Sequence, residues 1–117
     1  MYSGAIMDQN RIRVYRNADI KRVVAYIPPG HRHTRILIET IDGDIIVFQE
    51  ATIAGIVRAY VNVSLHPQRQ AVELVSRVML PREKKPGFAR DQLIESGRSE
   101  KEIFEELKNI IFYEEKS

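Results

Sequence analysis

The chain has 117 residues, of which 44% are hydrophobic and 29% are charged, and its formal net charge is +2. This composition is typical of a soluble globular protein with the length of one domain. The absence of cysteine excludes disulfides, thiolate metal sites and a cysteine nucleophile. Apolar runs such as Ile45–Phe48 are too short for a membrane-spanning helix.

Charge is unevenly distributed along the chain. Residues 1–38 hold seven Arg or Lys and two Asp, whereas residues 99–117 hold three Lys and six Glu. This asymmetry suits an anionic partner or contact between copies, although a normally solvated surface explains it as well. Residues 1–8 are interpreted as a loose tail without a secretory signal, so a cytoplasmic location is expected. Abundant Arg, Glu and Ile with few amides are typical of thermophiles.

The first predicted elements are strands. Residues 11–16 alternate polar and apolar side chains, as a half-buried strand does. Residues 22–27 are β-branched and aromatic, and they end at a Pro-Pro-Gly turn over residues 28–30, which cannot continue a paired strand.

An Asp-Gly pair at residues 42–43, between two apolar runs, predicts a β-hairpin whose two turn residues both take positive φ. This register places Ile38 opposite Val47 and Arg35 opposite Glu50. One face of the hairpin is then core. The other face mixes charged residues with three large apolar ones, namely Leu37, Ile46 and Phe48. It is predicted to lie under a helix or in a subunit contact.

Residues 52–60 are predicted to be helical, while residues 57–65 also fit an alternating strand. The helical alternative gives one apolar stripe, formed by Ile53, Ile56, Val57, Tyr60 and Val61.

Helices are also predicted from Pro67 to Met79 and over residues 89–96, with a charged loop over 81–87 between them. Ser99 and Glu102 form a predicted capping box that starts a last helix. Strands followed by helices predict a single α+β domain over residues 1–117. In it, a small antiparallel sheet, made of the N-terminal strands and the Asp-Gly hairpin, is covered by C-terminal helices.

Three histidines are weak candidates for metal ligands or catalytic bases: His31, His33 and His66. The first two are spaced to share one face of a strand. With Glu39 they are similar to part of a cupin metal motif, but no second motif follows. Metal sites need three or four converging ligands, so no metal and no cofactor is assigned.

Basic residues near the N-terminus suggest a polyanion or single-stranded nucleic acid as an alternative partner, since such sites combine cations with aromatic rings. The candidate residues are Arg11, Arg13, Tyr15, Arg32 and Arg35. Arginine stems that protect a sheet edge give the same pattern. A helix-turn-helix over residues 93–103 is rejected, because its second helix is net acidic and phosphates would repel it.

The leading hypothesis is a non-enzymatic cytoplasmic α+β module that self-associates as a homo-oligomer through Leu37, Ile46 and Phe48. Binding of nucleic acid or another polyanion ranks second. A histidine-based metal or hydrolytic site ranks third. No membrane partner is expected, and the sequence identifies no catalytic nucleophile with a base and an orienting carboxylate.

Overall fold

A computed structural model describes residues 11–116 of the chain. The predicted tail over residues 1–8 lies outside the described residues. In chain order the elements are η2 (Asn17–Asp19, a 3-10 helix), β1 (Ile20–Tyr26), β2 (Arg35–Thr40), β3 (Ile45–Gln49), α1 (Glu50–Leu65), β4 (Leu74–Val78), β5 (Asp91–Glu95) and α2 (Glu100–Lys116). The fold is α+β, as predicted. No helix within residues 11–116 is long and apolar enough to cross a membrane.

Strands β1, β2 and β3 form an antiparallel sheet in that order. The strand predicted over residues 22–27 is confirmed as β1. The strand predicted over residues 11–16 is wrong, because none of these residues is in a strand and residues 12–16 run as irregular chain into η2. The Arg16 backbone amide donates to Asp19 Oδ2 at 2.9 Å, and this bond helps to close the η2 turn. Alternating side chains make a strand only when a neighbouring strand pairs with it, and residues 11–16 pair with none of the described strands.

The β2–β3 hairpin is present, but its turn has three residues rather than two. The Gly43 amide donates to the Thr40 carbonyl oxygen at 3.0 Å, and the Thr40 amide donates to the Asp44 carbonyl oxygen at 2.9 Å. Gly43 has a φ of +95°, while no non-glycine residue of the described chain has positive φ. This is the pattern of a type I turn followed by a left-handed glycine. The predicted two-residue turn is therefore wrong.

The longer turn moves the hairpin register by one residue. Ile38 pairs with Ile46, and Leu37 pairs with Val47. A slip of one residue exchanges which side chains share a face. The predicted grouping of Leu37, Ile46 and Phe48 on one face is therefore wrong, since Leu37 lies on the face opposite the other two.

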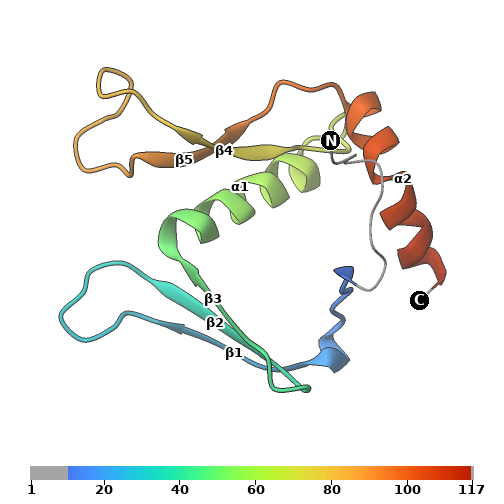
Figure 1. The fold of residues 1–117 in the computed structure, drawn as a ribbon, viewed down its shortest axis with the longest axis horizontal. Helices are drawn as coiled ribbons and strands as arrows, with labels where there is room; N and C mark the ends of the chain where they lie inside the picture. Colours follow the sequence, from blue (N-terminus) through green and yellow to red (C-terminus); the bar gives the residue numbers. More distant parts are fainter. Residues whose placement is uncertain (1–10, 117) are drawn as a thin grey trace.

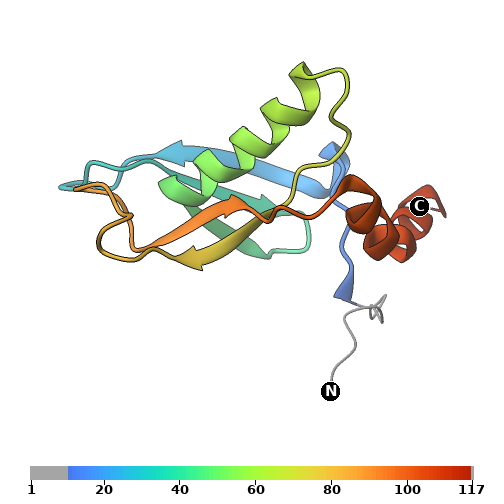
Figure 2. The ribbon, with the colours of Figure 1, turned by 90° about the horizontal axis from the view of Figure 1, so that it is seen from above.

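Helix α1 confirms the predicted helix and extends it to Leu65. Figure 1 shows α1 between the three-stranded sheet and the β4–β5 hairpin, and Figure 2 shows it crossing the strands obliquely. Its contact with the hairpin is close at Gly55, where an added Cβ would lie 2.8 Å from Leu93 Cδ1. The Arg58 guanidinium donates to the Leu93 carbonyl oxygen beside this contact. Gly55 thus allows the hairpin backbone to approach the helix.

The two helices predicted over residues 67–79 and 89–96 are wrong. Residues 74–78 and 91–95 instead form β4 and β5, an antiparallel pair in which Ser76 faces Leu93. Backbone bonds from Met79 to Arg90 and from Ser96 to Glu73 extend the ladder at both ends. The charged loop over residues 81–87 therefore joins two strands.

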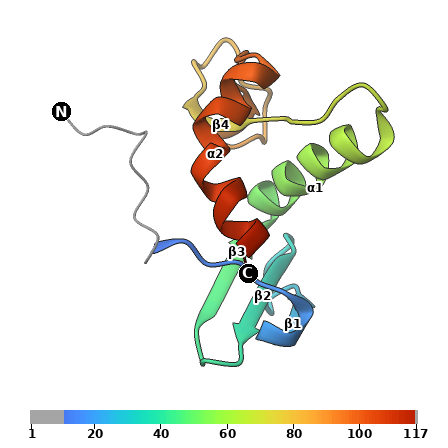
Figure 3. The ribbon, with the colours of Figure 1, turned by 90° about the vertical axis from the view of Figure 1, so that its right-hand side faces the viewer.

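Helix α2 begins with the predicted capping box. The Glu102 amide donates to Ser99 Oγ at 3.2 Å, and the Ser99 amide donates to Glu102 Oε1 at 3.0 Å. These bonds to the Ser99 backbone and hydroxyl lower the pKa of Glu102. Figure 3 shows α2 running from the β4–β5 hairpin toward the three-stranded sheet, and Ile103 in its first turn is buried.

Little apolar surface is enclosed by this arrangement. Among residues 11–116 only one hydrophobic side chain, Ile103, is buried, whereas eighteen large hydrophobic residues are exposed. The radius of gyration is 16.8 Å, compared with about 13 Å for a compact chain of this length. The elements are regular, but within one copy they do not close around a core.

Candidate functional site

The loop between β1 and β2 contains His31 and His33, and it begins with a tight turn. The His31 amide donates to the Pro28 carbonyl oxygen at 2.9 Å, and Gly30 has a φ of +82°. A positive φ at the third turn residue identifies a type II turn, which explains why glycine follows proline there. The His31 side chain is exposed, so the turn presents it to solvent.

His33 is held by Glu50, the first residue of α1. His33 Nδ1 lies 3.0 Å from Glu50 Oε2, and the Thr34 amide donates to Glu50 Oε1 at 2.7 Å. The Thr34 amide and then the His33 ring stabilise the carboxylate and lower the pKa of Glu50. Glu50 therefore joins the chain before β2 to the start of α1. It was predicted to pair with Arg35, but Arg35 pairs with Gln49.

His66 lies far from the other two histidines. It follows the last residue of α1, whereas Glu50, the partner of His33, is the first. A helix of 16 residues is about 24 Å long. Within residues 11–116 no group of three or more His, Cys, Asp or Glu could hold a metal ion. The structure does not bring the three histidines together.

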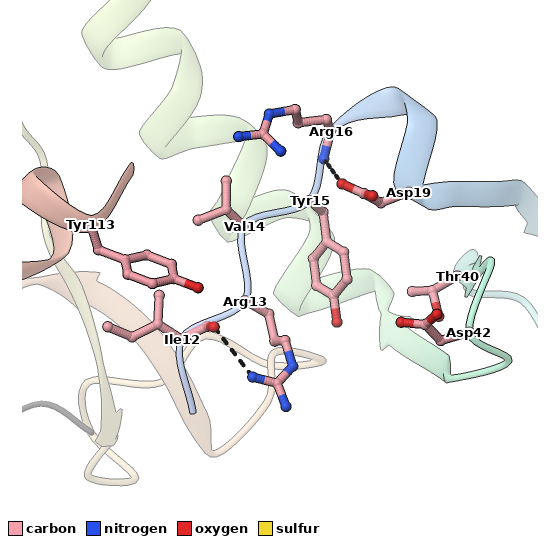
Figure 4. A pocket seen from close by; sticks show the side chains of 9 residues that line it. All are labelled: Ile12, Arg13, Val14, Tyr15, Arg16, Asp19, Thr40, Asp42 and Tyr113. Carbon is pink, nitrogen blue, oxygen red and sulfur yellow. Dashed lines mark hydrogen bonds between the residues drawn. The ribbon is translucent and has the colours of Figure 1, made fainter. Parts of the chain in front are cut away.

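The basic candidates separate into two groups at opposite ends of β2. Arg13 and Tyr15 line a cavity of about 260 Å³ together with Thr40, at the end of the strand, and Tyr113 of α2 (Figure 4). Arg35 is at the beginning of β2, where its guanidinium donates to the His33 carbonyl oxygen at 2.7 Å.

The remaining two candidates follow the same division. Arg11 precedes the first group in the chain, and Arg32 belongs to the loop that leads into Arg35. A six-residue strand separates its ends by about 17 Å. The five residues therefore do not form one compact site.

Three parts of the chain line the cavity shown in Figure 4: residues 12–19, residues 40–42 and α2. In Figure 4 the ring of Tyr15 lies between Arg13 and Asp42, and Tyr113 approaches from α2 beside Ile12. The Arg13 guanidinium also donates to the Ile12 carbonyl oxygen at 3.3 Å. Arg13 and Tyr113 both take part in further interactions.

An ion-pair network that sequence reasoning missed connects the β4–β5 hairpin to α2. Arg98 Nε lies 3.0 Å from Glu73 Oε1, in ion-pair contact but without hydrogen-bond geometry. Its Nη2 donates to Glu106 Oε1 at 2.9 Å. The hydrogen bond with Glu106 is the largest cause that raises the pKa of Arg98. In the sequence only the position of Arg98, next to a capping box, could have indicated this role.

A further contact strengthens the same junction. Glu100 Oε2 accepts the backbone amides of Gln70 and Ala71 at 2.9 and 3.2 Å. The polar clusters of the described chain thus join elements to one another.

The most distinctive surface is apolar and lies on α1. The side chains of Ile56, Val57, Tyr60 and Val61 are 49%, 51%, 69% and 38% exposed. They belong to the stripe that helical periodicity would direct toward a core. The β4–β5 hairpin contacts a different side of α1, at Gly55 and Arg58. These four side chains of the stripe therefore stay exposed in one copy, although α1 also contacts β2 and β3.

Both faces of the three-stranded sheet also carry exposed apolar side chains. Val23, whose partner is Ile38, is 60% exposed on one face. Ile45 and Val47 are 57% and 47% exposed on the opposite face, where Val47 pairs with Leu37. The predicted contact residues Leu37, Ile46 and Phe48 are half-buried.

The fold and these surfaces define an α+β protein that displays much of its apolar surface. The chain matches no protein-family model, no curated protein sequence and no solved structure. Its functional interpretation therefore depends on its own geometry.

Proposed function

We propose that the chain is a cytoplasmic, non-enzymatic module that self-associates, and that its fold is completed by contact with further copies. The observation behind this proposal is that Ile103 is the only buried hydrophobic side chain among residues 11–116. A folded core residue is normally enclosed by several neighbours. A chain with regular helices and strands but so little enclosed surface needs additional apolar contacts.

The accessible surface supports the same conclusion. It is 9584 Å², whereas a compact monomer of 13.6 kDa exposes about 6,600 Å². Residues 1–10 and 117 account for about 1,800 Å² at most. The surplus is therefore about 1,200 to 3,000 Å² per chain. Obligate homodimers bury about 1,000 to 2,500 Å² on each partner, which is the same range.

The alternative functions receive less support from the geometry. The candidate residues for single-stranded nucleic-acid binding lie at opposite ends of β2 and form no single basic patch. Catalysis or metal binding by histidine would require His66 to approach His33 along the whole of α1. Self-association requires no such rearrangement.

Size-exclusion chromatography with multi-angle light scattering tests the proposal. The expected result is a mass of at least twice 13.6 kDa at micromolar concentration. A single species of 13.6 kDa that remains folded at millimolar concentration would reject self-association. Fluorescence anisotropy with labelled single-stranded RNA, measured at several salt concentrations, would then test the polyanion alternative.

A further inference from the structure

We propose that the self-association interface is centred on α1, whose outer stripe packs against the same stripe of a second copy, with the two helices antiparallel across a two-fold axis. The α1 stripe is Ile53, Ile56, Val57, Tyr60 and Val61. This inference rests on the proposed function, and it adds the surface and the symmetry of the contact.

The opposite side of α1 is already occupied by the β4–β5 hairpin. An added Cβ at Gly55 would lie 2.8 Å from Leu93 Cδ1, and Arg58 donates to the Leu93 carbonyl oxygen. Further along the helix, Arg69 Nη1 donates to Asn62 Oδ1 at 3.2 Å. These contacts fix the rotation of α1 about its axis. The α1 stripe is then directed away from the hairpin.

The α1 stripe can be buried without burying an unpaired charge. Between Ala51 and Leu65 the only charged residue is Arg58, and its guanidinium is bonded to the Leu93 carbonyl oxygen. Burial of an unpaired charge is a large cost in an interface. Tyr60, 69% exposed near the middle of the helix, belongs to a residue type that is enriched at interface centres.

A second copy is the occupant that this surface fits best. A two-fold contact brings one patch onto its own equivalent, so a single interface covers the α1 stripe of both chains. The surplus of at least about 1,200 Å² per chain exceeds the roughly 800 Å² that a standard interface covers on each partner. A contact of this size needs a folded partner. It also extends beyond α1 to neighbouring surfaces of each copy.

An antiparallel arrangement is favoured by charge. Each helix has a positive N-terminal end and a negative C-terminal end. Antiparallel helices place unlike ends together. The axis then passes near Val57 and Tyr60, because they lie in the middle of Glu50–Leu65.

Single cysteines test this arrangement directly, because the wild-type chain contains none. Val57→Cys and Tyr60→Cys place one thiol each in the α1 stripe. Ile41→Cys is the matched control, since Ile41 is 62% exposed at the β2–β3 turn and lies away from α1. Each variant is treated with a short bismaleimide at a protein concentration where light scattering shows the oligomer.

The expected result is rapid formation of covalent dimer by Val57→Cys and Tyr60→Cys, at least tenfold faster than by Ile41→Cys. If scattering shows a dimer but Ile41→Cys cross-links as fast as the α1 variants, the α1 interface is wrong while self-association stands. If every variant stays monomeric, both proposals fail. Circular dichroism on each variant confirms that the comparison is made on folded protein.

A Val57→Glu variant provides an independent check. The introduced carboxylate would be buried in the α1 contact, so the dissociation constant of the dimer is expected to rise at least a hundredfold. Phe88→Glu is the control, because Phe88 is 57% exposed in the β4–β5 loop, and it should leave the dissociation constant within threefold of wild type. Equal effects of the two substitutions would overturn the assignment to α1.

Discussion

Gly43 determines the register of the β2–β3 hairpin. It follows a type I turn and takes a φ of +95°, a conformation that L-residues with a Cβ reach only with strain. An added Cβ would meet no atom within 4 Å, so the constraint comes from the backbone alone.

Substitution of Gly43 by alanine is expected to lower the free energy of unfolding by about 1 to 2 kcal/mol. Gly43→Asn is the control and should cost less, because asparagine tolerates left-handed backbone. Urea denaturation of the three proteins measures the difference. Equal stability of the alanine variant and the wild type would show that the turn does not require this conformation.

The Ser99–Glu102 capping box leads to a second expectation at this scale. Ser99→Ala removes the hydroxyl that caps the Glu102 amide, and loss of such a cap costs about 1 kcal/mol. Ser99→Thr keeps a hydroxyl and should retain most of this stability. Thermal unfolding at neutral pH distinguishes the two variants, and identical losses would mean that the cap contributes nothing.

The same box makes stability depend on pH. The pKa of Glu102 is lowered in the folded chain from its ordinary value of 4.5. The resulting stabilisation is present above pH 4.5 and is lost as pH falls through the lower folded pKa. Glu102→Gln should therefore lose less stability than the wild type between pH 6 and pH 3. Denaturant midpoints of both proteins, measured across this pH range, test the prediction. If the midpoints of the wild type and of Glu102→Gln fall in parallel as pH is lowered, the expectation is contradicted.

Individual residue contacts were predictable from the sequence where both partners belong to one local motif. The Ser99–Glu102 box is such a motif, since both partners lie within one helical turn. It failed for Glu50, whose partners His33 and Thr34 are 17 and 16 residues away. It also failed at residues 42–43, because an Asp-Gly pair fits both a two-residue and a three-residue turn.

At the scale of elements, α1 and the β4–β5 hairpin depend on one another. A two-stranded hairpin is marginally stable by itself, and here it contacts α1 through Leu93 and Gly55. The contact requires a residue without a large side chain in the helix.

Enlargement of Gly55 tests this dependence. Gly55→Ala should change the free energy of unfolding by less than about 1 kcal/mol, because better helix propensity offsets a 2.8 Å contact with the flexible end of Leu93. Gly55→Leu should cost about 2 kcal/mol or more through overpacking. In the Leu93→Ala background this cost should shrink. An undiminished cost would place the critical contact elsewhere.

The β4 and β5 strands show why element type could not be read from their sequences. Val72, Val75 and Val78 recur every three residues, which fits a helical stripe. Residues 74–78 form a strand because residues 91–95 are available to pair with them. Periodicity in one segment contains no information about such a distant partner. The β1 strand and α1 were predictable because their β-branched and apolar patterns agree with the structure they adopt.

In the molecule as a whole, one copy leaves exposed many apolar side chains whose sequence pattern indicates burial. The α1 stripe was visible in the sequence, and its spacing indicates burial. In the structure Ile56, Val57, Tyr60 and Val61 are 38% to 69% exposed, and Ile53 is half-buried. Sequence periodicity identifies which side chains require burial, but it does not tell whether the same chain or another copy supplies the cover.

If a second copy completes the fold, folding and association are coupled. The most direct measurement is equilibrium unfolding in denaturant across a hundredfold range of protein concentration. The midpoint is expected to rise with concentration, by the equivalent of about 2.7 kcal/mol per dimer over that range. A midpoint that stays constant, in a chain that unfolds cooperatively as a monomer, would contradict it.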